Sequence, residues 1–204
     1  MAILVLDVGG VVYRSWPDAA FHARWAERCG CDAATLQERF YAGDDWSLAD
    51  LGQISHAENI RRLAARLGLD VPAAREMVFE GWASQPDEAL AELVGRLRSA
   101  GTKVAALTNN ASTEAELLAR PELARLFDLA ISSADAGLAK PDPAFYRHAE
   151  ARLGAAGAAL VFVDDVEGNV EAARALGWRG VWFRSTDQAI GEIEAAFADK
   201  SPMV

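Results

Sequence analysis

The chain has 204 residues, 51% of them apolar and 25% charged, which is the composition of a folded globular protein rather than of a disordered or fibrous one. That length is enough for one sizeable domain, or for a core domain with a modest insertion. The formal net charge of −10 disfavours nucleic acid as a partner, because nonspecific binding needs clustered Lys and Arg side chains to displace counterions from phosphates.

The sequence also disfavours a membrane or secretory protein. The apolar stretch in "MAILVLDVGG" follows no basic region and is interrupted by Asp7, and no later segment has the length of a membrane span. The cysteines, Cys29 and Cys31, lack the partners of a zinc site and the spacing of a C-x-x-C redox pair, so we expect reduced structural thiols. We therefore expect a cytoplasmic protein.

Five short apolar runs are typical of strands that are buried on both faces of a parallel sheet. They are "AILVLDV" (2–8), "KVAALT" (103–108), "LAIS" (129–132), "ALVFVD" (159–164) and "GVWF" (180–183). The segments between them have helical composition, and two of them, residues 87–101 and 167–177, end on a glycine as helices often do. This alternation predicts an α/β fold with a doubly wound, Rossmann-like parallel sheet.

Residues 16–85 interrupt the alternation. They contain four helix-like segments, at residues 18–30, 32–43, 55–68 and 71–82, and no convincing strand. Such a stretch is too long for a simple crossover between strands. We predict an α/β core at residues 1–15 and 86–204 with a helical cap inserted at residues 16–85, which can form a lid over the strand ends.

Polar residues follow four of the predicted strands at their carboxyl ends, which converge on one crevice in a doubly wound sheet. They are Asp7, Thr108, Asn109, Lys140, Asp164 and Asp165. Carboxylates with oxygen-rich neighbours indicate a hard cation such as Mg²⁺, and Lys140 and Thr108 can hold an anion. A carboxylate can also attack phosphorus if positive charge screens the repulsion, and Asp7 is the best placed nucleophile.

Each of these residues also has a structural interpretation. Asp7 can simply end a strand, Thr108 can cap a helix that begins near residue 112, and Lys140 can be a solvated loop cation. The combination of all of them at matching strand ends favours a functional site.

In chain order, "DVGGVV", "LTNN", "AKPDP" and "VDDVEGN" resemble the four motifs of the haloacid dehalogenase-like hydrolase superfamily. The resemblance covers the whole chain, and residues 16–85 resemble the helical cap of that superfamily. The D-x-G form of the first motif and the cap sequences are most similar to a bacterial branch that includes alpha-D-glucose-1-phosphate phosphatases. The phosphatase domain of soluble epoxide hydrolase is a more distant relative.

The resemblance implies a magnesium site. Asp7 would be both the nucleophile and a metal ligand, and the carbonyl oxygen of Gly9 would be a second ligand. Asp165 would bind the metal directly, Asp164 would support it from beside or through water, and Asn169 would form a hydrogen bond behind them.

The resemblance also implies a phosphate site. Thr108 and the backbone at Asn109 would bind the phosphoryl oxygens. Lys140 would neutralise charge on the phosphoryl group and orient Asp7. Asp7, Thr108 and Lys140 are therefore the expected catalytic residues.

The sequence departs from the superfamily's pattern at Gly9, where many of its phosphatases carry an aspartate that acts as general acid and base. Asp44, Asp45 and His56 in the cap are candidates to replace it. For the aspartates, a turn followed by a helix N-cap is the simpler interpretation, and for the histidine a surface or packing role.

The leading hypothesis is a magnesium-dependent phosphatase that hydrolyses a small phosphomonoester, such as a sugar phosphate, through an aspartyl-phosphate intermediate. One alternative is a phosphate-ligand sensor or regulatory protein that turns over weakly, because Gly9 lacks an acid. A 2-haloacid dehalogenase and a sugar phosphotransferase fit the pattern less well. No long exposed apolar stripe demands a partner chain, so monomer and homodimer both remain open.

Overall fold

A computed structural model describes residues 2–14, 18–82 and 86–198. Five strands form one parallel sheet in the order β3-β2-β1-β4-β5, which confirms the predicted α/β fold. The strands are β1 (Ile3–Leu6), β2 (Val104–Thr108), β3 (Leu129–Ser132), β4 (Leu160–Asp164) and β5 (Arg179–Trp182). Each overlaps one of the five apolar runs in the sequence. Every residue of β1, β2 and β4 is buried, and strands buried on both faces are rich in apolar residues.

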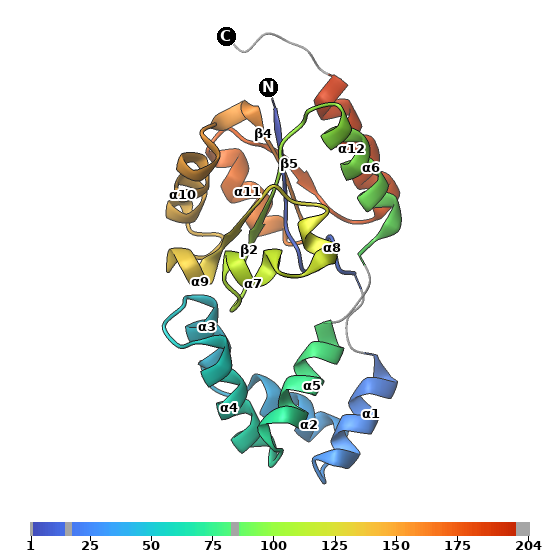
Figure 1. The fold of residues 1–204 in the computed structure, drawn as a ribbon, viewed down its shortest axis with the longest axis vertical. Helices are drawn as coiled ribbons and strands as arrows, with labels where there is room; N and C mark the ends of the chain where they lie inside the picture. The colour runs from blue at the N-terminus through green and yellow to red at the C-terminus, as the bar shows by residue number, and fades with distance from the viewer. Residues whose placement is uncertain (1, 15–17, 83–85, 199–204) are drawn as a thin grey trace.

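Helices cover both faces of the sheet (Figure 1). On one face lie α6 (Glu88–Ser99) and α12 (Thr186–Ala198), and on the other lie α10 (Pro143–Leu153) and α11 (Glu167–Ala175). Successive side chains of β1 alternate between two apolar clusters: Leu4 and Leu6 pack in the cluster that includes α6, and Ile3 and Val5 pack in the cluster that includes α10. The shorter helices are α7 (Glu114–Leu118), α8 (Pro121–Ala124), α9 (Ser133–Ala136) and the 3₁₀ helix at Gly157–Ala159.

A separate helical layer lies below the sheet in Figure 1. It consists of α1 (Ala19–Arg28), α2 (Ala33–Tyr41), α3 (Asp45–Asp50), α4 (His56–Leu67) and α5 (Val71–Trp82). These helices surround an apolar cluster of their own, in which Trp25, Leu36 and Leu63 are fully buried. Four of the helices correspond to the helix-like segments in the sequence, whereas α3 is an additional short helix. The predicted ends of the insertion, residues 16 and 85, lie outside the described residues.

The carboxyl ends of the strands face this helical layer. In Figure 1, β1 starts near the N-terminus and runs toward α1–α5, and the other strands are parallel to it. The layer touches the core where α3 packs against α9. Just after α3, Gly52 has a φ of +66°, and a β-carbon there would lie 2.1 Å from the carbonyl oxygen of Ala134. Only glycine permits this close approach.

On the core side, the two chain segments that flank the helical layer in the sequence lie side by side. Tyr13 forms an antiparallel bridge with Pro86, and the N–H of Asp87 donates to the carbonyl of Val12 over 2.9 Å. Arg14 pairs with the Asp87 carboxylate at 3.5 Å. These contacts hold residues 12–14 and residues 86–87 together.

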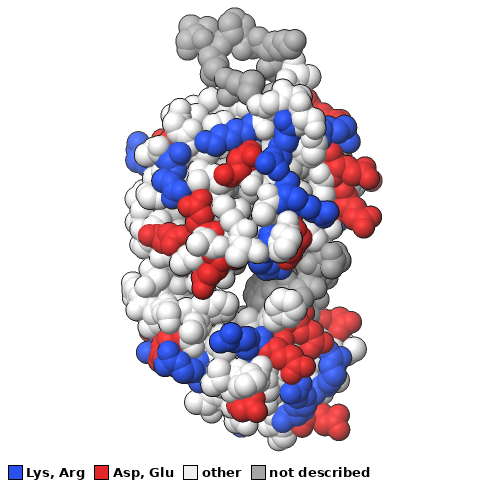
Figure 2. Space-filling model, in the orientation of Figure 1, with Lys and Arg blue, Asp and Glu red and all other residues white. Residues whose placement is uncertain are grey.

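The surface charge is mixed. Figure 2 shows basic and acidic side chains interspersed over both the core and the helical layer on the face that it displays. Within the described residues, no helix combines the length and the apolar character that crossing a bilayer requires.

Candidate active site

Asp7 and Asp164 lie side by side at the carboxyl ends of neighbouring strands. The register of β1 and β4 pairs Leu6 with Val163, so the next residues, Asp7 and Asp164, are level. The N–H of Asp7 donates to the carbonyl of Val163 over 2.9 Å. Asp165 joins them: one carboxylate oxygen from each of the three aspartates lies within 4.8 Å of the others. The sheet thus brings Asp7 beside Asp164 and Asp165, which lie more than 150 positions later in the sequence.

Lys140 lies between two of these carboxylates. Its Nζ is 2.9 Å from Asp7 Oδ1 and 2.6 Å from Asp164 Oδ2, and its side chain is almost completely buried. Burial alone would lower the pKa of Lys140, but the negative charges of Asp7 and Asp164 outweigh it and raise the pKa. Lys140 therefore stays protonated and provides a fixed positive charge beside Asp7.

The two oxygens of Asp7 have different surroundings. Oδ1 accepts from the backbone N–H of Val8 at 2.7 Å and from Lys140, whereas no described residue donates to Oδ2. Burial raises the pKa of Asp7 to about 6, an effect that Lys140 opposes and Asp164 adds to. One oxygen thus orients the carboxylate, and the other is left for a reacting group.

Asp164 is fully occupied by protein groups. Its Oδ1 accepts from Nδ2 of Asn169 at 3.0 Å and from the N–H of Val166 at 2.8 Å, and its Oδ2 accepts from Lys140. Asn169 is itself held, because the Tyr146 hydroxyl donates to its carbonyl over 2.8 Å. Asp164 therefore acts as the rigid centre of the cluster.

Asp165 is more exposed than Asp164 and lies next to Gly10, in the turn after β1. Gly10 has a φ of +75°, and a β-carbon there would lie 2.1 Å from Asp165 Oδ2. Burial raises the pKa of Asp165, with a further contribution from the charge of Asp164. Since Asp165 has fewer protein partners than Asp164, its oxygens are better placed to bind a ligand.

The cluster suits a hard divalent cation. Three ionised carboxylates and one ammonium carry a formal charge of −2. Burial is the main cause of the raised pKa of Asp7 and of Asp165, and the negative charge of Asp164 adds to both shifts. The candidate metal-ligand atoms of these three side chains are all carboxylate oxygens, which Mg²⁺ prefers. The residues present therefore fit a magnesium ion.

The remaining predicted site residues lie at the same edge. Thr108 is the last residue of β2 and is buried; since Leu6 pairs with Ala106, it is level with Val8, one residue beyond Asp7. Thr113, not Thr108, caps the following helix. Asn109 contacts Lys140 through its side chain. At Gly9, an added β-carbon would meet no atom within 4 Å.

The candidate acids in the helical layer differ in their surroundings. Asp45 pairs with Arg62 at 2.9 Å and with Arg66 at 2.7 Å, which hold the pKa of its carboxyl below the usual range. Asp44 is exposed and precedes α3 without a side-chain capping bond. His56 begins α4, and its pKa is lowered by burial and raised in part by Glu116 of the core. Asp45 is thus structural, whereas the pKa of His56 is influenced by the charge of a core residue.

The sequence pattern did not indicate two further features, a pair of serines beside the site and an aspartate of the helical layer. Ser132 donates to the carbonyls of Asn110 and Ser112, and Ser133 accepts from the N–H of Asn110 at 2.9 Å, so both serines hold the loop after β2. Their only signal was a pair of hydroxyls at the end of β3. Asp50, in the helix that packs on α9, is partly buried, and burial raises its pKa to about 6.

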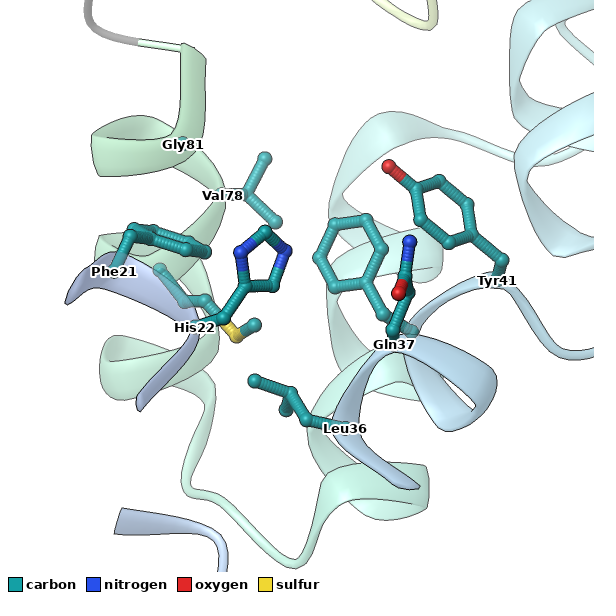
Figure 3. Close-up of a pocket in the computed structure, with 9 residues that line it drawn as sticks. Phe21, His22, Leu36, Gln37, Tyr41, Val78 and Gly81 are labelled. Carbon is teal, nitrogen blue, oxygen red and sulfur yellow. The ribbon is translucent and has the colours of Figure 1, made fainter. Parts of the chain in front are cut away.

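A cavity within the helical layer is distinct from this site (Figure 3). It lies between α1, α2 and α5, and His22 projects into it among apolar side chains. Its lining includes Phe21, Leu36, Phe40 and Met77, none of which belongs to the carboxylate cluster. The volume of about 20 Å³ holds roughly one water molecule. It is a packing gap rather than a substrate pocket.

Comparison with known proteins was consistent with this geometry. A family model described as haloacid dehalogenase-like hydrolase matches residues 1–177. Bifunctional epoxide hydrolase 2 of Sus scrofa is 29% identical over 216 residues, covering 93% of this chain and 38% of that protein. A sesquiterpene phosphatase of Aspergillus oryzae is 30% identical over 141 residues, covering 68% of this chain and 71% of that protein.

The chain spans only a small part of the length of some relatives. Acyl-CoA dehydrogenase family member 10 of Mus musculus is 24% identical to this chain, and the match covers 94% of this chain but 19% of that protein. Among solved structures, a HAD family enzyme from Bacteroides thetaiotaomicron, in complex with magnesium and inorganic phosphate, has a TM-score of 0.72 at 19% identity, with 91% of this chain and 96% of that chain covered. Because the family model covers most of the sequence and the solved structure shares its fold, the chain belongs to the haloacid dehalogenase-like hydrolase family.

Proposed function

We propose that this protein is a magnesium-dependent phosphatase that hydrolyses a small phosphomonoester through a phosphorylated Asp7. The observation that carries the proposal is the state of Asp7: Oδ1 is held by Lys140 and the Val8 N–H, while Oδ2 has no donor among the described residues. A carboxylate oriented in this way can attack a phosphorus atom. Two similar proteins support this chemistry: one is described as a sesquiterpene phosphatase, and the other was solved in complex with magnesium and inorganic phosphate.

The magnesium ion would be held by Asp7, the carbonyl oxygen of Gly9 and Asp165. Asp164 would support it from beside or through water, and Asn169 would fix Asp164 through the hydrogen bond of 3.0 Å. When bound, the ion supplies positive charge that offsets the charge of the phosphoryl group.

The first half of the reaction uses groups that the chain itself provides. Asp7 Oδ2 attacks phosphorus, a bond forms between them, and the bond from phosphorus to the leaving oxygen breaks. Lys140 neutralises part of the charge on the phosphoryl oxygens, which Thr108 and the backbone N–H of Asn109 also bind. With a pKa of about 6, Asp7 is largely ionised at neutral pH, as attack requires.

The second half releases inorganic phosphate. A water molecule attacks the phosphorus of the acyl phosphate, the bond to Asp7 breaks and the carboxylate is regenerated. The leaving oxygen takes a proton in the first half, and the attacking water loses one in the second. Since Gly9 has no side chain, solvent water or a group from the helical layer must carry these protons.

Residues 16–85 would act as a cap in this reaction. The carboxyl ends of the strands face the helical layer, and the turn after α3 rests on α9, which leads directly to the Lys140 loop. A cap in this place would exclude water from Asp7 and contact the part of the substrate beyond the phosphoryl group. Sugar phosphates are the substrate class we expect from the sequence resemblance.

The open space at Gly9 favours a second candidate function, a phosphate-ligand sensor that turns over weakly. Loss of a general acid and base typically costs about 10²- to 10⁴-fold in rate. The sensor would bind a phosphate compound through the same residues and release product very slowly.

The test is phosphate release from an aryl phosphate, several hexose phosphates and a nucleotide, with magnesium and with a chelator. Asp7→Asn is the matched variant, because it removes the nucleophile but keeps the shape of the side chain. We expect release by the wild type that requires both magnesium and Asp7. Activity retained in a folded Asp7→Asn variant would rule out the mechanism. Magnesium-dependent binding of phosphate without turnover by the wild type would favour the sensor.

A further inference from the structure

The side chain of Asn109 forms two hydrogen bonds with the backbone of one other residue, Lys140. Its Nδ2 donates to the carbonyl oxygen of Lys140 at 2.9 Å, and its Oδ1 accepts from the N–H of Lys140 at 2.8 Å. The two residues are 31 positions apart, at the end of β2 and in the loop after α9. A single amide thus satisfies both polar groups of the Lys140 backbone.

This contact restricts the position of Lys140 at its backbone. A donor and an acceptor on one planar amide resist both translation of the Lys140 backbone and its rotation relative to Asn109. At the other end of the lysine, Nζ contacts Asp7 and Asp164. Lys140 is therefore fixed at both ends, by Asn109 at the main chain and by two carboxylates at the ammonium group.

The loop that carries Lys140 needs such a constraint. It follows Gly137, which has a φ of +64°, and it ends at Asp142, the N-cap of α10, so Lys140 belongs to neither helix. Loops are in general more mobile than the elements that they connect. An ammonium group carried by a loop keeps a catalytic position only if other contacts locate its backbone, because a shift of about 1 Å can reduce a rate by 10²-fold.

We propose that the Asn109 side chain is the positioning residue for Lys140, holding its backbone so that the ammonium group reaches Asp7. The proposal rests on the proposed phosphatase function for its effect on rate, but the positioning itself is a property of the protein alone. It assigns the Asn109 side chain a role distinct from that of its backbone N–H, which would bind phosphate.

The sequence offers a direct way to observe this ammonium group. The chain has three lysines, Lys103, Lys140 and Lys200. Lys103 is exposed, Lys140 is buried between carboxylates, and Lys200 lies outside the described residues. In protein labelled with ¹⁵N-lysine, NMR detects ammonium groups whose protons exchange slowly with water, and a Lys140→Arg variant assigns the signal of Lys140.

The experiment measures hydrogen exchange of the Lys140 ammonium in wild type, Asn109→Ala, Asn109→Asp and Asn110→Ala. Asn110→Ala is the matched control, because that side chain accepts from Ser112 and contacts no part of Lys140 among the described residues. We expect exchange in Asn109→Ala to be about tenfold faster or more, since two hydrogen bonds are lost. Asn109→Asp keeps the acceptor for the Lys140 N–H but loses the donor to the Lys140 carbonyl. The exchange rate of the Lys140 ammonium in this variant should therefore fall between the rates in wild type and in Asn109→Ala. Asn110→Ala should match the wild type.

Turnover gives a second readout through a double-mutant cycle with Lys140→Ala. If Asn109 acts through Lys140, Asn109→Ala lowers kcat about tenfold in the wild type but less than about twofold in the Lys140→Ala background. A merely structural role would instead lower the melting temperature and reduce kcat by the same factor in both backgrounds, which would overturn the proposal.

The two proposals fail in different ways. Wild-type exchange of the Lys140 ammonium in both Asn109 variants would overturn the positioning role, whatever the activity. Faster exchange of the Lys140 ammonium in the Asn109 variants, together with a wild type that hydrolyses no phosphomonoester, would uphold the positioning role and refute the phosphatase function.

Discussion

The carboxylate of Asp165 occupies the space into which a β-carbon at Gly10 would project. An alanine at this position would place Cβ 2.1 Å from Asp165 Oδ2. The glycine turn after β1 therefore leaves room for the carboxylate that we propose as a metal ligand.

Gly10→Ala should consequently displace Asp165 and weaken magnesium binding by about tenfold or more, because metal affinity depends on the position of every ligand. Calorimetric titration with Mg²⁺ measures the effect. Gly30→Ala is the control, since Gly30 has a φ of +63° with no atom within 4 Å of an added β-carbon. Backbone strain should lower the free energy of unfolding of that variant by about 1 kcal/mol, and the variant should bind magnesium as the wild type does. Equal affinities in the two variants would show that Asp165 does not depend on Gly10.

Gly9→Asp should introduce the missing acid. The position has no positive φ and nothing within 4 Å of an added β-carbon, so the backbone there accepts a residue with a β-carbon. For alkyl phosphates, whose leaving groups need a proton, we expect turnover to rise by about 10²-fold. For aryl phosphates, whose leaving groups need little protonation, the change should be much smaller. Gly9→Asn has the same shape without the acid, and a rise in that variant would exclude proton transfer as the cause.

Gly52→Ala should loosen the contact between the helical layer and the core. The added methyl group would lie 2.1 Å from the carbonyl oxygen of Ala134, so the turn after α3 must move away from α9. Hydrogen exchange measured by mass spectrometry should increase in α3 and α9. Gly68 has a similar φ of +69° but no neighbour within 4 Å, so Gly68→Ala tests backbone strain alone and should leave exchange in α9 unchanged. Unaltered exchange in both variants would argue against a packed contact.

Asp50 should lower the stability of the protein as pH rises. Burial raises its pKa to about 6 in the folded state, above the ordinary value of 3.8. Between these values the folded state binds more protons than the unfolded state, so the free energy of unfolding falls as pH increases from about 4 to about 6. Asp50→Asn should remove this decrease and, because Asp50 is only partly buried, add about 1 to 2 kcal/mol at pH 7. Urea unfolding of both proteins at pH 4.5 and pH 7 provides the comparison, and a stability difference independent of pH would contradict the expectation.

Much of the architecture could be predicted from the sequence. The five apolar runs identified the strands because residues in a parallel sheet are buried on both faces, and apolar composition is a local signal. Asp7, Lys140 and Asp164 could be selected because parallel strands bring their carboxyl ends to one edge. The structure places these three side chains in contact, as that rule leads one to expect.

Other features depended on tertiary contacts that leave no local pattern. Asp45 and Asp50 lie in the same short helix, yet one pairs with two arginines of α4 and the other lies partly buried without an ionic partner among the described residues. The bond from Asn109 to the Lys140 backbone joins segments 31 residues apart. Strand formation follows from the apolar character of neighbouring residues, so the sequence by itself determined the sheet and the residues at its edge. Hydrogen bonds, burial and the approach of Asp165 to Gly10 depend on distances across the fold, so only the tertiary structure decided which of those residues are held, buried or left free to react.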